Sequence, residues 1–185
     1  MRHDVAASAY PRILPASPIA AVRSTTDDFW REALNRPVDR TARFAGFSLI
    51  MDENDLLARF GLTPAADDLP EIRRLIEAET DDNDRTSNEA LKLLCTQLFS
   101  AGIASDALLI FEAKMSSFDA GCTIDIQLVC GAGLEATEEF LHSSSAPEAK
   151  ELLAMLEDCK RAGDFEGFTP QQQLASYRQY YGISS

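Results

Sequence analysis

The stretch that decides the fold runs from Thr86 to Gly133, TSNEALKLLCTQLFSAGIASDALLIFEAKMSSFDAGCTIDIQLVCGAG. Apolar residues recur in it at intervals of three and four, which places them on one face of a helix. Ala-Gly pairs interrupt this pattern at Ala101-Gly102 and Ala132-Gly133, and another pair follows at Ala162-Gly163. Breaks separated by 31 and 30 residues predict a series of helical hairpins.

The first predicted hairpin occupies about residues 86–116. Thr86 and Glu89 have the spacing of a capping box, which favours a helix start. Gly102 is a residue at which a helix ends easily. Ser105 can then cap the return helix.

A third helix is predicted from about Asp119 to Cys130, capped by Asp119 or by Ser117, and a strand is its alternative. Four residues between these positions are β-branched, which favours strands: Thr123, Ile124, Ile126 and Val129. The length of the segment and its helical neighbours favour a helix.

Two further units follow, at about 117–145 and 146–182. A single hairpin cannot bury its apolar face, so neighbouring hairpins must stack. The sequence therefore predicts an all-α fold of stacked antiparallel hairpins, in a right-handed array like that of tetratricopeptide (TPR) or HEAT repeats. We expect residues 25–185 to form this single domain. Residues 1–24 are rich in proline and predict an irregular, extended arm.

The charge of the chain favours a basic protein as its partner. It carries 17 basic and 30 acidic side chains, a net charge of −13, and the acidic excess is strongest in 51–84. Such a balance repels phosphate backbones and argues against direct binding of nucleic acid. It attracts a basic protein and speeds the encounter.

Other classes of protein find little support. No apolar run approaches the roughly 20 residues of a membrane span, and prolines interrupt the start where a secretory signal needs an apolar core. We expect a cytoplasmic protein. The four cysteines form no Cys-x-x-Cys pair and have no histidine at ligand spacing. The sequence thus predicts no metal site, disulfide framework or cofactor.

Nor does a catalytic set stand out. Asp119 and Asp125 are six residues apart, so on a helix they would not share a face as paired carboxylates. Cys122 or Cys130 would need a histidine base, and His142 is remote in sequence. An enzyme with a site that no motif reveals stays an alternative.

Three groups of residues are candidates for binding a protein partner. One is the acidic run at 77–84, which we expect to be an exposed loop that meets the partner together with the acidic residues at 52–55. Another is a polar ledge where two hairpins join, and the third is the aromatic C-terminal end. The candidates are Asp81, Asp82 and Asp84; Ser116, Ser117, Asp119, Asp125 and Gln127; and Arg178 and Tyr180.

The segment SSFDAGCTIDIQLVCGAGLEATEEFL, within about 100 residues from Leu91 to Tyr181, resembles uncharacterised bacterial helical-repeat proteins of the immunity or toxin-neighbour type. The resemblance implies an immunity protein, which neutralises a cognate toxin by occluding the toxin's basic active-site surface. It implies no catalytic residue. A helical-repeat scaffold that grips a peptide is the alternative, and neither hypothesis fixes an oligomeric state.

Overall fold

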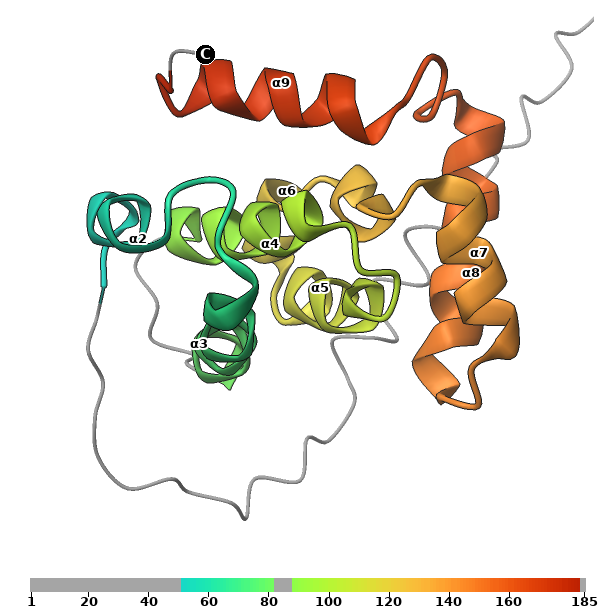
Figure 1. Cartoon of the computed structure of the whole chain (residues 1–185). Helices are drawn as coiled ribbons and strands as arrows, with labels where there is room; N and C mark the ends of the chain where they lie inside the picture. Colours follow the sequence, from blue (N-terminus) through green and yellow to red (C-terminus); the bar gives the residue numbers. More distant parts are fainter. Residues whose placement is uncertain (1–50, 82–87, 184–185) are drawn as a thin grey trace, which may run out of the picture.

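The computed structural model describes residues 51–81 and 88–183, and every regular element in them is helical (Figure 1). This confirms the all-α prediction for the described part of the chain. In chain order the elements are α2 (Glu53–Phe60), the 3-10 helix η1 (Ala66–Asp68), α3 (Leu69–Asp81), α4 (Glu89–Ala101), α5 (Asp106–Met115), α6 (Phe118–Thr123), the 3-10 helix η2 (Ile126–Cys130), α7 (Leu134–Ser143), α8 (Pro147–Ala162) and α9 (Pro170–Tyr180). The predicted arm at 1–24 and the capping box at Thr86 lie outside the described residues.

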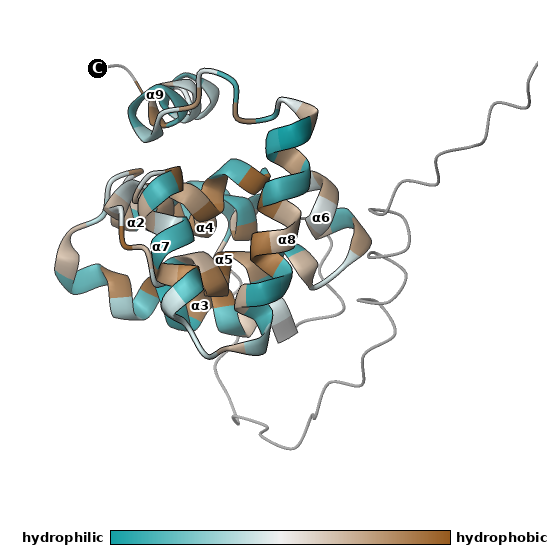
Figure 2. Cartoon of the chain, turned by 90° about the vertical axis from the view of Figure 1, so that its right-hand side faces the viewer, coloured by the Kyte–Doolittle hydropathy of each residue, from teal (hydrophilic) through white to brown (hydrophobic). Residues whose placement is uncertain are grey.

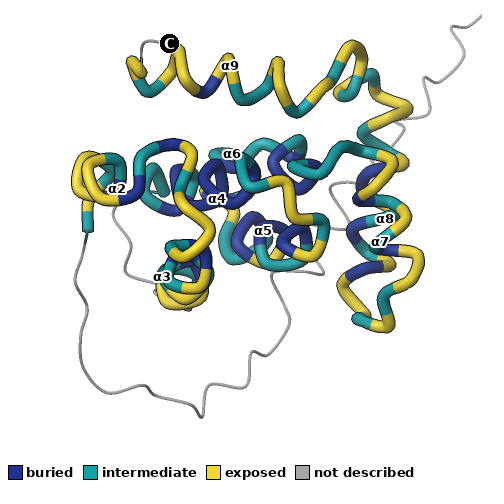
Figure 3. The backbone as a smooth tube through the Cα atoms, in the orientation of Figure 1, coloured by how far each residue is buried: buried dark blue, intermediate teal, exposed yellow. Residues whose placement is uncertain are grey.

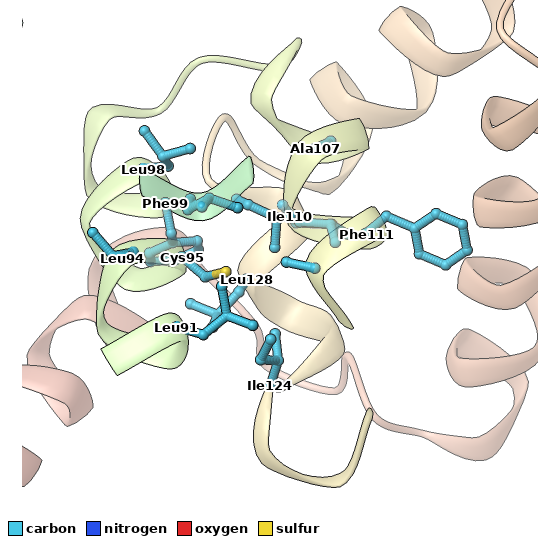
Figure 4. Packing of buried hydrophobic residues seen from close by; sticks show 14 of the residues in the cluster. Leu91, Leu94, Cys95, Leu98, Phe99, Ala107, Ile110, Phe111, Ile124 and Leu128 are labelled. Carbon is cyan, nitrogen blue, oxygen red and sulfur yellow. The ribbon is translucent and has the colours of Figure 1, made fainter. Parts of the chain in front are cut away.

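Helix α4 lies at the centre of the molecule, and α2, α3, α5, α6, η2 and α9 all pack against it. Its buried residues are Leu91 and Leu93 to Phe99, a run interrupted only by the partly exposed Lys92. A helix that is apolar on all sides must be covered on all sides. Figure 3 shows the buried residues gathered on α4 and α5, and Figure 2 shows the hydrophobic residues concentrated on the same central helices. Figure 4 shows part of this core, to which α4, α5 and η2 contribute side chains.

Helices α7 and α8 form an antiparallel hairpin beside this centre, and contact it through η2 and α5 (Figure 1). Helix α9 then leaves α8 and runs across α4. The predicted unit at 146–182 is therefore not a closed hairpin, because the second helix packs on α4. The reason is visible in α9 itself, where Tyr177 is the buried residue and its ring lies against Phe99 of α4.

The predicted helix at 119–130 is wrong in its middle, because it is divided into α6 and η2. The backbone is extended at Ile124 (φ −88°, ψ 114°) and at Asp125 (φ −67°, ψ 138°). The ammonium of Lys114 on α5 donates hydrogen bonds to the carbonyl oxygens of Gly121 (2.5 Å) and Ile124 (2.6 Å). In a continuous helix these oxygens would accept from backbone N–H groups four residues later. The strand alternative is also wrong in this segment.

Several predicted helix ends are confirmed. Gly102 and Gly163 adopt the left-handed conformation at the ends of α4 and α8. Ser117 caps α6 by accepting from the N–H of Ala120. Ser105 precedes α5 as expected but makes no capping hydrogen bond. The next residue, Asp106, is buried and receives two hydrogen bonds from the Arg73 guanidinium, at 2.7 and 3.0 Å. No described helix combines the length and apolar character needed to cross a bilayer.

Gly131 marks the closest approach of η2 to α4. A Cβ atom at this position would lie 2.4 Å from the carbonyl oxygen of Phe99 and 2.9 Å from its Cα. The backbone of Gly131 is helical (φ −59°, ψ −35°), a conformation that alanine adopts readily. Space therefore selects glycine here, whereas at Gly133 the positive φ of 96° selects it and nothing lies within 4 Å of an added Cβ.

We expect Gly131→Ala to lower the free energy of unfolding by about 1–3 kcal/mol, because the methyl group overpacks the α4 backbone. If backbone entropy alone mattered, the same change would stabilise the fold by about 0.4–1 kcal/mol. Urea unfolding followed by circular dichroism measures the sign. Gly133→Ala is the comparison variant, with a loss of about 1–3 kcal/mol from its positive φ and no clash. A stabilised Gly131→Ala variant would contradict the close approach.

Candidate interaction surface

Two tyrosines hold α9 on the body of the protein. The hydroxyl of Tyr177 donates a hydrogen bond of 2.5 Å to Oδ2 of Asp125, at the break between α6 and η2. The Tyr177 ring stacks on the Tyr181 ring, with centroids 6.5 Å apart. Burial, together with the Asp125 carboxylate, raises the pKa of the Tyr177 hydroxyl. Tyr177 therefore stays protonated and acts as a donor to Asp125 over the whole physiological range.

Lys92 of α4 contacts both the Tyr177–Asp125 pair and the exposed Tyr180. Its Nζ lies 3.8 Å from Oδ2 of Asp125, and it lies above the rings of Tyr177 (5.9 Å to the centroid) and Tyr180 (5.0 Å). A lysine ammonium at such distances is attracted by the aromatic ring. The side chain of Lys92 is 15% exposed, so its charge is largely shielded from water and remains close to Asp125.

Tyr180 is the outermost member of the group, and 58% of its surface is exposed. Its hydroxyl donates to Oε2 of Glu89 at 3.2 Å, and its ring meets Tyr181 at a right angle with centroids 4.9 Å apart. The charges of Glu89, Glu53 and Asp125 raise the pKa of the Tyr180 hydroxyl, with Glu89 the main cause. We call the group formed by these residues the Tyr180 patch: Glu53, Glu89, Lys92, Asp125, Tyr180 and Tyr181.

The structure brings some of the predicted partner-binding residues together. Asp125 and Tyr180 both belong to the Tyr180 patch, which they share through Lys92. Gln127 lies near the same end of η2 and donates to the carbonyl oxygen of Asp164 at 2.8 Å. Arg178 is exposed on α9, and it forms no ion pair with any described residue.

The other candidates do not join the Tyr180 patch. Ser116 donates to the carbonyl oxygen of Ala113 and Ser117 caps α6, so both hydroxyls are used within the α5–α6 turn. Asp119 is exposed on α6. Asp82 and Asp84 lie outside the described residues, and the described structure does not extend to the side chain of Asp81 at the end of α3.

Sequence reasoning missed three charged residues that organise this region: Glu89, Lys92 and Lys114. Glu89 was considered only as half of a capping box. The other two carry a signal, because each is the only base of a largely apolar helix. Burial lowers the pKa of the Lys114 ammonium, which is kept in place by its carbonyl partners.

The described residues form a small pocket and no cluster of three metal-ligating side chains. One shallow pocket of about 160 Å³ lies between η2 and the start of α9, lined by residues that include Gln127, Asp164, Phe168 and Gln173. Sites for small molecules usually enclose about 300–1,000 Å³. Within 51–81 and 88–183, no three histidine, cysteine or acidic side chains gather as metal ligands would.

The cysteines differ in environment. Cys95 and Cys130 are buried, Cys159 is half-buried and Cys122 is exposed. Burial raises the pKa of the Cys130 thiol to about 12 and that of Cys159 to about 11. Thiols of this kind are the inert, structural type, since the thiolate is the nucleophile.

Comparison with models of protein families, with curated proteins and with solved structures found no match to this chain.

The hydrogen bond from Tyr177 to Asp125 fastens α9 to the break between α6 and η2, and we call it the latch. It leads to a prediction for α9. Tyr177→Phe keeps the ring against Phe99 but removes the donor to a carboxylate, which typically contributes about 1.5–3 kcal/mol. We expect amide hydrogen exchange to become faster along α9 and to change little in α3. Ser176→Ala is the matched control, because its hydroxyl donates only to the exposed carbonyl of Gln172 in the same helix. Equal exchange in both variants would contradict the latch.

Burial of Cys130 leads to a prediction at alkaline pH. The unfolded chain releases the thiol proton near pH 9.0, while the folded chain keeps it up to about pH 12. The unfolded state therefore binds fewer protons in this window, and stability falls as pH rises, by about 1.4 kcal/mol per unit for one such group.

We expect the Cys130→Ala variant to escape this loss, so its stability relative to the wild type should rise between pH 9 and pH 12. Urea unfolding at several pH values measures it. Cys122→Ala, at the exposed cysteine, should follow the wild type. Parallel curves for Cys130→Ala and the wild type would show that the thiol is not buried.

Proposed function

We propose that this chain is a protein-binding module whose negative surface pairs with a basic partner protein. The described residues carry 23 acidic and nine basic side chains, a net charge of −14. This imbalance would draw a basic surface toward the protein and repel an acidic one.

The proposal depends on how the basic side chains are paired. Seven of the nine are engaged within the fold: Arg59 and Arg74 with Glu71, Arg73 with Asp106, Lys92 with Asp125, Lys160 with Glu138, Arg161 with Asp158, and Lys114 with two carbonyl oxygens. The remaining two, Lys150 and Arg178, are exposed. Most basic side chains are thus paired within the chain, several of them at its surface, and acidic side chains far outnumber the two bases that remain.

The partner that we propose is a bacterial toxin in the cytoplasm, neutralised when the acidic surface covers the toxin's basic active site. The support is this surface, and the choice of a toxin comes from the resemblance proposed for residues 91–181 in the sequence. Under this proposal the acidic run with Asp81, Asp82 and Asp84 joins the contact, and a TPR-like or HEAT-like stacking of the hairpins stays a prediction.

Co-production with a basic toxin, sought among the products of the genes beside that of this chain, tests the proposal directly. Cells that make both proteins should survive, and the purified pair should form a complex. Loss of survival with no complex would reject the immunity function. Recovery of several unrelated proteins in place of one basic partner would favour the scaffold.

Electrostatic steering gives a quantitative form of the same test. Glu77 and Asp119 are exposed, so Glu77→Lys/Asp119→Lys removes four units of negative charge with little effect on packing. We expect association with the basic partner to slow by about tenfold at low salt and to depend less on salt. Stopped-flow measurements at several salt concentrations give both quantities.

The opposite change at the two unengaged bases is the matched control. Lys150→Glu/Arg178→Glu adds four units of negative charge and should speed association. Equal rate constants for the two double variants would show that surface charge does not guide the encounter.

A further inference from the structure

We propose that the Tyr180 patch is the place where this protein receives an arginine side chain of its basic partner. This inference rests on the proposed function and adds to it a contact surface and the chemistry of the group that binds there.

The aromatic ring of Tyr180 is both exposed and fixed in position. Tyr180 has 58% of its surface open to solvent, although its hydroxyl is bonded to Glu89 and its ring is packed on Tyr181. Most exposed side chains lose rotamer freedom when a partner covers them, which weakens binding. A tyrosine already held in place loses less, and tyrosines of this kind are common anchors of interfaces.

The ring of Tyr180 already interacts with one cation. Lys92 lies 5.0 Å from its centroid, so the electron-rich face of Tyr180 is used for a cation–π contact within the fold. Lys92 also pairs with Asp125 at 3.8 Å. The charge of Lys92 is therefore balanced by Asp125, and Glu53 and Glu89 leave the rim of the patch negative.

The patch favours a planar cationic group over a compact one. A guanidinium is planar, so it can stack on the exposed part of a tyrosine ring and donate to a neighbouring carboxylate at the same time. Glu89 is this neighbouring carboxylate, because its Oε2 lies 3.2 Å from the Tyr180 hydroxyl. An ammonium can make the ionic contact but cannot stack. Arginine thus fits the patch better than lysine.

Charge complementarity also distinguishes between classes of occupant. A second copy of this chain would bring a net charge of −13 to a negative rim. A purely apolar segment would find little beyond Tyr180 to cover, since Ile183 is the other large apolar residue exposed at this end of α9. A basic segment avoids both difficulties.

A defined peptide tests the inference on the full-length protein. The probe is acetyl-Leu-Arg-Leu-Arg-Leu-amide, and its matched control carries neutral citrulline in place of both arginines. Biosynthetic 3-fluorotyrosine gives each tyrosine a fluorine signal, and Tyr180→Phe identifies that of Tyr180. We expect the Tyr180 signal to shift with the arginine peptide, and the citrulline peptide to bind about tenfold more weakly.

Variants of the protein separate the contributions. Tyr180→Ala and Glu89→Gln should each weaken binding of the arginine peptide by about fivefold or more, followed through the Tyr181 signal. Gln179→Ala, at the neighbouring exposed residue of α9, should leave it unchanged. Equal binding by all four proteins, equal binding of the two peptides, or a Tyr180 signal that shifts only with protein concentration would overturn the inference.

Failure of the arginine site and failure of the proposed function give different results. If the toxin partner binds and Tyr180→Ala binds it as tightly as the wild type, the function stands and this surface is wrong. If no basic protein binds while the arginine peptide still shifts the Tyr180 signal, the patch stands and the immunity function is wrong.

Discussion

The structure depends on the burial of α4 from every side. A helix that is largely apolar and buried on nearly all sides is stable only when other elements cover each face. The two uncharged polar residues within its buried run are Thr96, whose hydroxyl donates to the carbonyl oxygen of Lys92, and Gln97, whose amide donates to the carbonyl oxygen of Gly61 at 2.7 Å. These bonds reduce the cost of burying them. The second one also fixes the end of α2 against α4.

Two basic side chains then decide how the covering helices are arranged. Arg73 reaches from α3 to the buried Asp106 with two hydrogen bonds, and so ties the start of α5 to α3. Lys114, at the other end of α5, holds the backbone of the α6–η2 segment. A buried charge is tolerated only with partners that compensate for lost water. Because each partner lies on a different helix, satisfying the charge also sets the position of that helix.

Much of the helix pattern could be predicted from local chemistry. The ends at Gly102 and Gly163 and the cap at Ser117 follow from the preferences of single residues, and they appear where expected. The break at Ile124 and the path of α9 could not be predicted in this way. Both depend on contacts between residues far apart in sequence, Lys114 with Ile124 and Tyr177 with Asp125. Among the candidate site residues, Asp125 and Tyr180 were found from composition, but Glu89 and Lys92 gained their role only from the crossing of α9 over α4.

The Tyr180 patch is therefore a consequence of how α4 is covered. Glu89 and Lys92 lie in the first turn of α4, where the helix emerges from the core, and α9 is the element that covers this end. Asp125 can accept from Tyr177 because the backbone is extended at 124–125. Lys114 stabilises this extension by donating to the carbonyl oxygen of Ile124. If 119–130 were one helix, Asp125 would follow the helical turn and the latch would have no acceptor. The same carboxylate thus fastens α9 and balances Lys92. A surface whose charges are fixed by core contacts keeps its shape before a partner arrives, and this lowers the entropic cost of binding.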